Sequence, residues 1–300
     1  MRELVVLGTA SQVPTRDRNH NGYLLRWDGW GPQDGLLFDP GEGTQRQLTH
    51  AGVSSSSVTR ICLPHVHGDH SLGLPGVLSR MVLDGVEHPV HLHYPRSGDD
   101  VVRALVGLAT PGLDLRLAPH DEDGPVADGL EVARLRHRID AFGYRVVEPD
   151  GWAVDPDRAR AAGVAGPRIG EVLRGTGRVP VADIASPRPG QRFAIVMDTA
   201  RCAGAEALAE RADLLLAEST FADEHADLAE AYLHLTAGQA GTLARAGGAR
   251  RLVLTHFSAR YRDLTPLLDQ ARATAGSTEA LLAHDLDHIA LPPRRPPLPR

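Results

Sequence analysis

The chain has 300 residues, of which 42% are hydrophobic and 23% are charged, and its formal net charge is −6. This length and composition predict one large globular domain or two small ones, and they exclude the disordered and membrane-spanning classes. The acidic balance argues mildly against nucleic-acid binding, although a local basic patch can oppose the net charge. All 32 basic residues are arginine, so each of them offers a planar fork that suits phosphate.

Short apolar runs alternate with helical patterns along the chain, which is typical of α/β folds. The runs that we interpret as strands are Leu4–Leu7, Tyr23–Arg26, Gly35–Phe38, Arg60–Leu63, Val90–His93, Val132–Leu135, Phe193–Met197, Leu214–Ala217 and Leu252–Thr255. The first run is too short for a secretory signal, so we expect a cytoplasmic protein. A helical period covers residues 72–82, a capping box at Thr236 opens a helix to about Ala246, and Thr265 with Pro266 caps and starts another.

Residues from about Glu148 to Arg192 differ from the rest of the chain, because they are rich in proline, glycine and arginine. They contain only short helical patterns, at Pro156–Ala162 and Arg168–Arg174. We therefore expect a single domain over residues 1–300, with this segment projecting from it as an arm.

The segment Pro64–His70 places three imidazoles and one carboxylate within six residues, directly after a short apolar run. His65 and His67 alternate, so both can point to one side at the end of a strand, and Asp69 and His70 follow a glycine. Imidazole and carboxylate without thiolate suit zinc, with manganese or iron as alternatives. A solvated polar loop would leave four liganding groups unexplained. We therefore interpret this segment as a metal site.

Three other predicted strands are followed by groups that can bind metal: His137, Asp198 and His256. Functional groups in α/β sheets gather at the carboxyl ends of strands. One partition of the ligands places His65, His67 and His137 on a first ion, Asp69, His70 and His256 on a second ion, and Asp198 between the two. Paired ions about 3.5–4 Å apart activate water at neutral pH and stabilise charge during displacement at phosphorus. The spacing therefore predicts a dinuclear hydrolytic centre.

Further motifs occur in a recognisable order along the chain: Pro14–Asn19, the acidic glycine-rich turn Phe38–Gln45, His137 with Ala141–Arg145, Asp198-Thr199, His234–Thr236 and Thr255–Tyr261. Together with the metal-binding segment they cover nearly the whole length, and they resemble the ribonuclease Z family of tRNA 3′-processing endonucleases, in the metallo-β-lactamase superfamily. The resemblance implies an α/β fold of the metallo-β-lactamase type, an αββα sandwich with an inserted exosite arm. It also implies two Zn²⁺ ions per chain, a homodimer, and an arm that clamps the body of the tRNA.

The same resemblance implies that the 3′ trailer of precursor tRNA is removed, leaving a 3′-hydroxyl on the tRNA and a 5′-phosphate on the trailer. We expect Asp69 to accept the proton of the attacking water while it remains a metal ligand. Glu218 and His234 would form a relay that protonates the departing ribose 3′ oxygen. The structural alternatives are a buried strand-end carboxylate paired with an arginine for Glu218, and a helix-leading histidine for His234.

The chain departs from the family where Ala217 replaces the histidine that usually precedes the glutamate, and where acidic residues nearly cancel the arginines of the arm. Two other functions stay open: a hydrolase of a small phosphodiester, sulfate ester or lactone, and a non-catalytic RNA-binding module stabilised by metal. The run His284–His288 also has metal-like spacing, but it lies near the end of the chain. We expect a surface or strand-edge role for it.

Overall fold

The computed structural model describes residues 2–28 and 35–298. The chain divides into two compact units. The main unit comprises Met1–Val146 and Phe193–Pro292, and the small unit comprises Val147–Arg192 and Pro293–Arg300. The expectation of a single domain with a projecting arm stays a prediction.

The first sheet of the main unit has the strand order β18-β1-β3-β4-β5-β6-β7. Its strands are β1 (Glu3–Gly8), β3 (Gly22–Arg26), β4 (Gly35–Phe38), β5 (Val58–Cys62), β6 (Val90–Pro95), β7 (Leu115–His120) and β18 (His288–Ala290). The pairs from β18 to β4 are antiparallel, and those from β4 to β7 are parallel. The parallel strands direct their carboxyl ends to one edge, where the loop after β5 begins.

The second sheet has the order β17-β15-β14-β13-β10-β9-β8. Its strands are β8 (Gly124–Ala127), β9 (Leu130–Leu135), β10 (Ala141–Val147), β13 (Arg192–Val196), β14 (Leu214–Glu218), β15 (Arg251–Thr255) and β17 (Glu279–Leu282). The pairs from β13 to β17 are parallel, whereas β8, β9 and β10 form antiparallel pairs. A short parallel pair, β2 (Ala10–Ser11) with β16 (Phe257–Ser258), joins two loops of the main unit.

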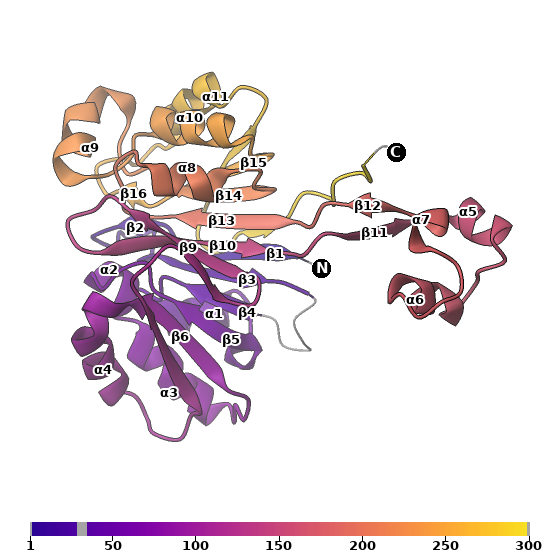
Figure 1. Ribbon diagram of the computed structural model, residues 1–300. Coiled ribbons are helices and arrows are strands. Elements are labelled where there is room, and N and C mark those ends of the chain that lie inside the picture. The colour runs from indigo at the N-terminus through magenta and orange to yellow at the C-terminus, as the bar shows by residue number, and fades with distance from the viewer. Residues whose placement is uncertain (1, 29–34, 299–300) are drawn as a thin grey trace. The chain divides into compact units, whose positions relative to one another are not determined.

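The two sheets lie face to face, and helices cover both outer sides, so the predicted αββα sandwich is confirmed (Figure 1). Large rings fill the space between the sheets; the Phe38 ring lies 5.9 Å from that of Tyr144 and 5.8 Å from that of Phe193. The outer helices of the first sheet are α1 (Thr44–His50), α3 (Leu74–Leu83) and α4 (Asp99–Gly107), and those of the second sheet are α8 (Ala203–Ala209), α10 (Ala237–Gly247) and α11 (Thr265–Ala275). Because the central strands are covered on both faces, they read as continuous apolar runs rather than alternating ones.

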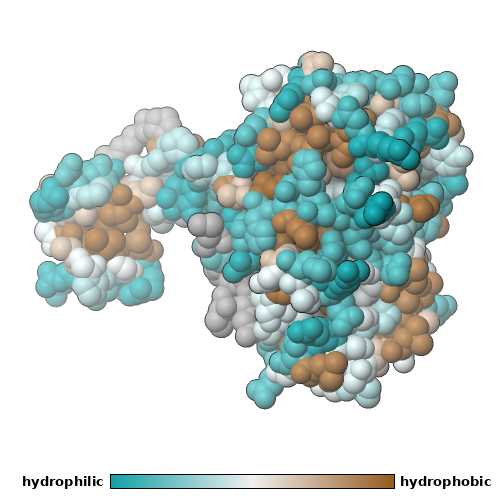
Figure 2. Space-filling view, turned by 180° about the vertical axis from the view of Figure 1, so that it is seen from behind, coloured by the Kyte–Doolittle hydropathy of each residue, from teal (hydrophilic) through white to brown (hydrophobic). Residues whose placement is uncertain are grey.

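The small unit contains the antiparallel pair β11 (Gly151–Val154) and β12 (Ala185–Arg188), with the short helices α5 (Pro156–Ala161), α6 (Pro167–Leu173) and α7 (Val181–Ile184). Asp155 caps α5 by accepting hydrogen bonds from the backbone of Asp157 and Arg158. A small apolar cluster that includes Val172 and Ile184 holds the unit together. Figure 2 shows apolar side chains gathered on the visible face of this unit, inside a hydrophilic rim.

Most local predictions agree with the structure. Each of the nine apolar runs overlaps an observed strand, and Thr236 forms the predicted capping box with Gln239. The predicted cap at Thr265 is wrong, because Thr265 is the first residue of α11 and its backbone N–H donates to Asp263 at 2.9 Å. No helix in the described part of the chain is long and apolar enough to span a membrane.

Candidate metal centre

The segment after β5 carries the predicted ligands out of the sheet and into a short helix, α2 (Gly68–Ser71). His65 lies in the connecting loop, and His67 is the residue before α2 begins. The hydroxyl of Ser71 donates to the carbonyl of His67 at 2.8 Å, which holds the turn. His65 and His70 are fully buried, so their imidazoles face the interior of the site.

The other three predicted ligands follow strands of the second sheet. His137 comes two residues after β9, Asp198 two residues after β13, and His256 directly after β15. Asp198 and His256 have positive φ angles of 34° and 59°, which are uncommon for residues other than glycine and mark a constrained backbone at functional sites. Here the unusual backbone turns both side chains toward the segment from the first sheet.

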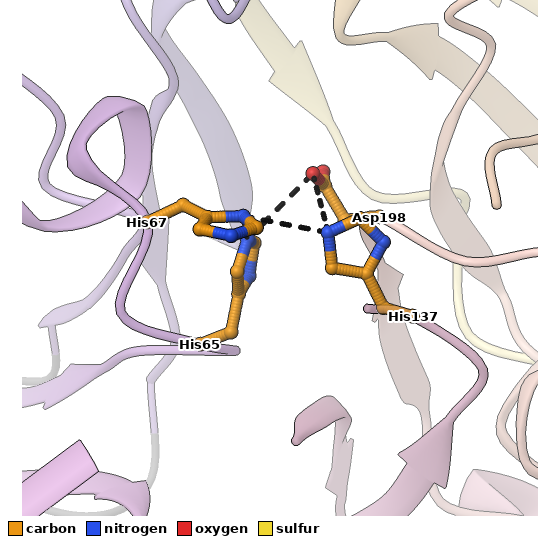
Figure 3. Close-up of side chains that lie close together, drawn as sticks. All are labelled: His65, His67, His137 and Asp198. Atoms are coloured by element: carbon orange, nitrogen blue, oxygen red, sulfur yellow. Dashed lines mark hydrogen bonds and ion pairs between the residues drawn. The ribbon is translucent and has the colours of Figure 1, made fainter. Parts of the chain in front are cut away.

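His65, His67, His137 and Asp198 point toward one another from the two sheets (Figure 3). The Nε2 of His65 lies 2.9 Å from the Nδ1 of His67, and the Nε2 of His137 lies 3.4 Å from that same nitrogen. The Oδ2 of Asp198 lies 3.6 Å from His65 and 3.7 Å from His137. Three imidazole nitrogens and one carboxylate oxygen therefore surround a common point.

Asp69, His70 and His256 form a second group beside the first. The Oδ2 of Asp69 lies 3.3 Å from His70 and 3.7 Å from His256. The other oxygen of Asp198, Oδ1, lies 3.3 Å from His70 and 3.1 Å from His256. Asp198 thus presents one oxygen to each group, which is the arrangement of a carboxylate that bridges two ions.

The second ring nitrogens of three of these histidines have orienting partners. The Nδ1 of His137 lies 3.4 Å from the carbonyl of Leu233, and that of His256 lies 2.7 Å from the hydroxyl of Thr220. The Nδ1 of His70 lies 3.3 Å from the carboxylate of Asp39. Such partners fix the tautomer that leaves Nε2 free for a metal ion.

The roles of Asp39 and Thr220 were not predicted from the sequence. Asp39 is fully buried directly after β4, with a φ of 50°. The neighbouring Gly41 packs under the metal-binding segment, because a Cβ at Gly41 would lie 2.2 Å from the carbonyl oxygen of Asp69. The available signal for Asp39 was its position at the end of an apolar strand, the same signal that identified Asp198.

The chemistry of this donor set fits divalent metal ions. The Oδ1 of Asp198 and the Nε2 of His256 are buried and have no hydrogen-bond partner among the described residues. Burial lowers the pKa of His65 and of His137, which favours the neutral, liganding imidazole. Burial acts to raise the pKa of Asp198, but the surrounding histidines outweigh it and hold that pKa well below the usual value. Ionised carboxylate and neutral imidazole are the forms that bind a metal.

Asp69 is held by a second loop of the main unit. The backbone N–H of Gln12 donates to the Oδ2 of Asp69 at 2.9 Å, and the carbonyl of Gln12 lies 3.1 Å from the Nε2 of His20. The partly buried Asp285 accepts from the backbone N–H of Asn19 at 2.6 Å and from the hydroxyl of Thr9 at 2.8 Å. The loop at 9–20 is thereby fixed at both ends. Asp285 lies in the run His284–His288 and anchors this loop through these two hydrogen bonds, whereas His288 lies on the edge strand β18.

Glu218 and His234 meet beside the metal-binding groups. The Nδ1 of His234 lies 3.0 Å from the Oε1 of Glu218, which also accepts from the backbone N–H of Thr199 at 2.7 Å. The hydroxyl of Thr220 donates to the other carboxylate oxygen at 2.6 Å. Burial acts to lower the pKa of His234, but Glu218 and Asp198 outweigh it and raise that pKa to about 9. The described contacts of the Glu218 carboxylate are thus with Thr199, Thr220 and His234, and none of them is with an arginine. The contact with Nδ1 orients the ring of His234.

Ala217 does not take part in these contacts. It packs with Val196 and Leu254 in the layer between the second sheet and its helices, on the opposite face of β14 from Glu218. The groups that hold Glu218 come from Thr199, Thr220 and His234 instead.

Comparisons with known proteins agree with this architecture. The family model of the metallo-beta-lactamase superfamily matches residues 15–151. A protein named Ribonuclease Z from Streptomyces avermitilis is 52% identical, over 98% of this chain and 99% of that protein. A Ribonuclease Z from Chlamydia abortus is 43% identical, over 87% of this chain and 88% of that protein.

Solved structures give the same result for the fold. The short form of human tRNase Z matches with a TM-score of 0.67 and 27% identity, over 97% of this chain and 99% of that one. The metallo-beta-lactamase fold protein YhfI from Bacillus subtilis matches with a TM-score of 0.70 at 17% identity, over 95% of this chain and 96% of that one. The second likeness concerns the fold alone.

Proposed function

Because this chain belongs to the ribonuclease Z family of the metallo-β-lactamase superfamily, and is thereby a hydrolytic endoribonuclease, we propose that it removes the 3′ trailer from precursor tRNA. One observation carries the proposal: the candidate metal ligands and the His234–Glu218 pair lie together in a chain of which 98% matches a protein named Ribonuclease Z. The expected products are a tRNA with a 3′-hydroxyl and a trailer with a 5′-phosphate.

The proposed cofactors are two Zn²⁺ ions per chain. His65, His67 and His137 would hold the first, Asp69, His70 and His256 the second, and Asp198 would bridge them. Zinc in such a site lowers the pKa of bound water toward neutrality and neutralises charge that develops at a phosphodiester. Imidazole and carboxylate donors also bind manganese and iron. Metal analysis of the purified protein therefore decides the identity of the ions.

Asp69 is proposed to accept the proton of the attacking water. Burial acts to raise the pKa of Asp69, but the neighbouring His70 and His256 outweigh it and keep that pKa far below its usual value. The carboxylate is therefore ionised at neutral pH and can accept a proton. The hydrogen bond from the backbone of Gln12 fixes its orientation.

His234 is proposed to donate the proton that the departing ribose 3′ oxygen needs. Its Nδ1 faces Glu218, so Nε2 is the nitrogen that can reach the leaving group. Both oxygens of Glu218 already accept hydrogen bonds, which suits a residue that orients His234 and stabilises its protonated form. Glu218 is thus the positioning member of the relay.

The small unit is proposed to bind the body of the tRNA, and the protein is proposed to act as a homodimer in the cytoplasm. Arg168, Arg174 and Arg178 are exposed in the small unit, where guanidinium groups can contact phosphates. Other arginines there are engaged; Arg160 pairs with Asp157 at 2.6 Å and Arg158 donates to backbone carbonyls. The exposed arginines are therefore the ones that should contribute to the salt dependence of tRNA binding.

Cleavage-site mapping on a precursor tRNA with a 3′ trailer tests the proposal. We expect one cut directly after the discriminator nucleotide, and its loss when metal is removed with a chelator. A small phosphodiester serves as the comparison substrate. If the protein hydrolyses only the small phosphodiester and leaves the precursor intact, it is the alternative small-molecule hydrolase, and if it cleaves neither, it is a binding module.

A further inference from the structure

An exposed aromatic side chain lies beside the relay and has no part in the proposed chemistry. Tyr232 ends α9 (Ala226–Tyr232), two residues before His234, and 45% of it is exposed. Its ring lies 6.4 Å from the ring of Phe221 at an angle of 23°, and Phe221 in turn lies 6.1 Å from the ring of His234. Tyr232 is therefore connected to the relay histidine through one buried ring.

The position of Tyr232 is fixed from several directions. Leu233 takes a left-handed conformation with a φ of 60°, and its carbonyl faces the Nδ1 of His137. The guanidinium of Arg138 lies over the Tyr232 ring, 4.9 Å from its centroid, and donates to the carbonyl of Ala231 at 3.1 Å. A solvent-exposed tyrosine that needed only to fill a surface would not require this support. The arrangement is that of a preformed flat platform.

We propose that Tyr232 and Arg138 form a stacking platform for the nucleobase on the leaving side of the scissile phosphodiester. Single-stranded RNA is recognised largely by stacking of bases on aromatic rings and on arginine planes. The platform adjoins His234, which protonates the leaving ribose oxygen, so the base that it receives belongs to the nucleotide that retains that oxygen. In precursor tRNA this is the discriminator nucleotide. The inference rests on the proposed function and adds a specificity determinant to it.

The test combines variants of Tyr232 with substrates that lack one base. Precursor tRNA is prepared with a normal discriminator, with an abasic discriminator, or with an abasic first trailer nucleotide. We expect Tyr232→Ala to lower kcat/KM on the normal substrate by about fivefold to a hundredfold, the range that base stacking gives. The loss should largely disappear on the substrate with the abasic discriminator and persist on the substrate with the abasic trailer nucleotide. Tyr232→Phe should keep the stacking surface and restore kcat/KM.

Variants of Arg138 distinguish a stacking role of its guanidinium plane from a role of its positive charge. Arg138→Lys keeps the positive charge but loses the planar group. We therefore expect it to lower kcat/KM on the normal substrate to the same extent as Arg138→Ala. Arg116→Ala removes a matched exposed arginine on β7, where it pairs with Asp114, and provides the control for loss of charge.

Three outcomes would overturn the inference while wild-type cleavage after the discriminator still supports the proposed function. One is an equal loss for Tyr232→Ala on normal and abasic-discriminator substrates, which would indicate a structural role. Another is coupling to the trailer base, which would place the platform on the other side of the bond. A full rescue by Arg138→Lys would show that charge alone matters. If the wild-type protein does not cut after the discriminator, the proposed function itself fails.

Discussion

At the scale of single residues, the two oxygens of Asp198 face two different sets of imidazoles. We therefore predict that Asp198→Ala lowers the metal content below two ions per chain. Loss of a residue that only orients a ligand typically costs about tenfold to a hundredfold, so loss of a bridging ligand should lower activity by about a hundredfold or more. Metal analysis and a cleavage assay measure the two effects, with Asp287→Ala, which removes a partly exposed carboxylate paired with His284, as the control. Unchanged stoichiometry and activity would contradict the dinuclear centre.

His234 gives a second prediction at this scale, because a general acid matters to turnover more than to metal retention. His234→Ala should lower kcat by about a hundredfold to ten-thousandfold, the range of general acid catalysis, with metal content and precursor binding close to those of the wild type. His284→Ala, which replaces an exposed histidine, is the matched control. A His234→Ala protein with normal turnover, under conditions where chemistry limits the rate, would refute the relay.

The residues that could be predicted are those whose chemistry shows in local spacing. His65, His67, Asp69 and His70 follow one another within six residues, so their pattern predicts a common site from the sequence alone. Thr220 and the backbone of Gln12 act through contacts between distant segments, with His256 and with Asp69. A hydroxyl or a backbone N–H carries no such signal in the sequence, and its role depends on the folded geometry.

At the scale of elements, β6 and β7 each carry a buried histidine in the first sheet. Burial lowers the pKa of His93 to about 3 and that of His120 to about 4, whereas an unfolded chain titrates near 6.5. Below pH 6.5 the unfolded state therefore binds protons that the native state does not, and stability falls as the pH falls toward 4. At pH 5 this amounts to about 2 kcal/mol for each histidine.

Urea unfolding at pH 7.5 and pH 5.0, with chelator present throughout, measures this effect. Replacing His93 or His120 by glutamine should reduce the difference in unfolding free energy between the two pH values, even where the variant is less stable at both. The histidines of the candidate metal centre contribute equally to wild type and variants, so their effect cancels in the comparison. His284→Gln is the control, since 66% of that side chain is exposed. If the His93 and His120 variants show the same difference in unfolding free energy between the two pH values as the wild type, these two histidines do not cause the loss of stability.

The elements that were predicted are the ones that tertiary structure reinforces. Strands such as β1 and β14 are buried along their length, so their apolar runs are unbroken. β10 was not predicted as a strand, because Gly143 and Arg145 interrupt its pattern. The structure explains the glycine: a Cβ at Gly143 would lie 2.8 Å from the carbonyl oxygen of Ile195 and 2.4 Å from the side chain of Leu208. Close packing of a helix against a strand is a tertiary requirement and overrides local propensity.

At the scale of the whole molecule, the candidate metal centre of the main unit draws on both sheets. His65, His67, Asp69 and His70 follow the first sheet, whereas His137, Asp198 and His256 follow the second. The sequence predicts that four of the nine strands are followed by candidate ligands, but the order of strands within a sheet depends on pairings between distant segments. Family resemblance predicted the sandwich, and the αββα layering confirms it.

The small unit gives the last prediction, because hydrogen bonds join the two chain segments at which its residues 148–191 begin and end. The backbone N–H of Glu148 donates to the carbonyl of Gln191 at 2.9 Å, and the N–H of Gln191 donates to the Glu148 carboxylate at 3.0 Å. The two chain segments at 148 and 191 therefore lie side by side, and a short glycine linker can replace residues 150–189. None of the proposed metal ligands or relay residues lies in that segment. We expect the shortened protein to hydrolyse a small phosphodiester at the wild-type rate and to show a raised KM for precursor tRNA.

The comparison of two substrates decides what the segment does. Replacing Arg168, Arg174 and Arg178 together by glutamine in the full-length protein provides a matched control that keeps the small unit. This variant should also raise KM and should lower the salt dependence of precursor binding, by about 0.9 in the slope of log K against log salt for each duplex phosphate that the protein no longer neutralises. Parallel losses of both activities in a shortened protein that is still folded, as judged by circular dichroism and metal content, would instead place the segment in the catalytic site. A raised KM for precursor tRNA alone identifies the segment as a binding element, because only the large substrate extends beyond the metal centre.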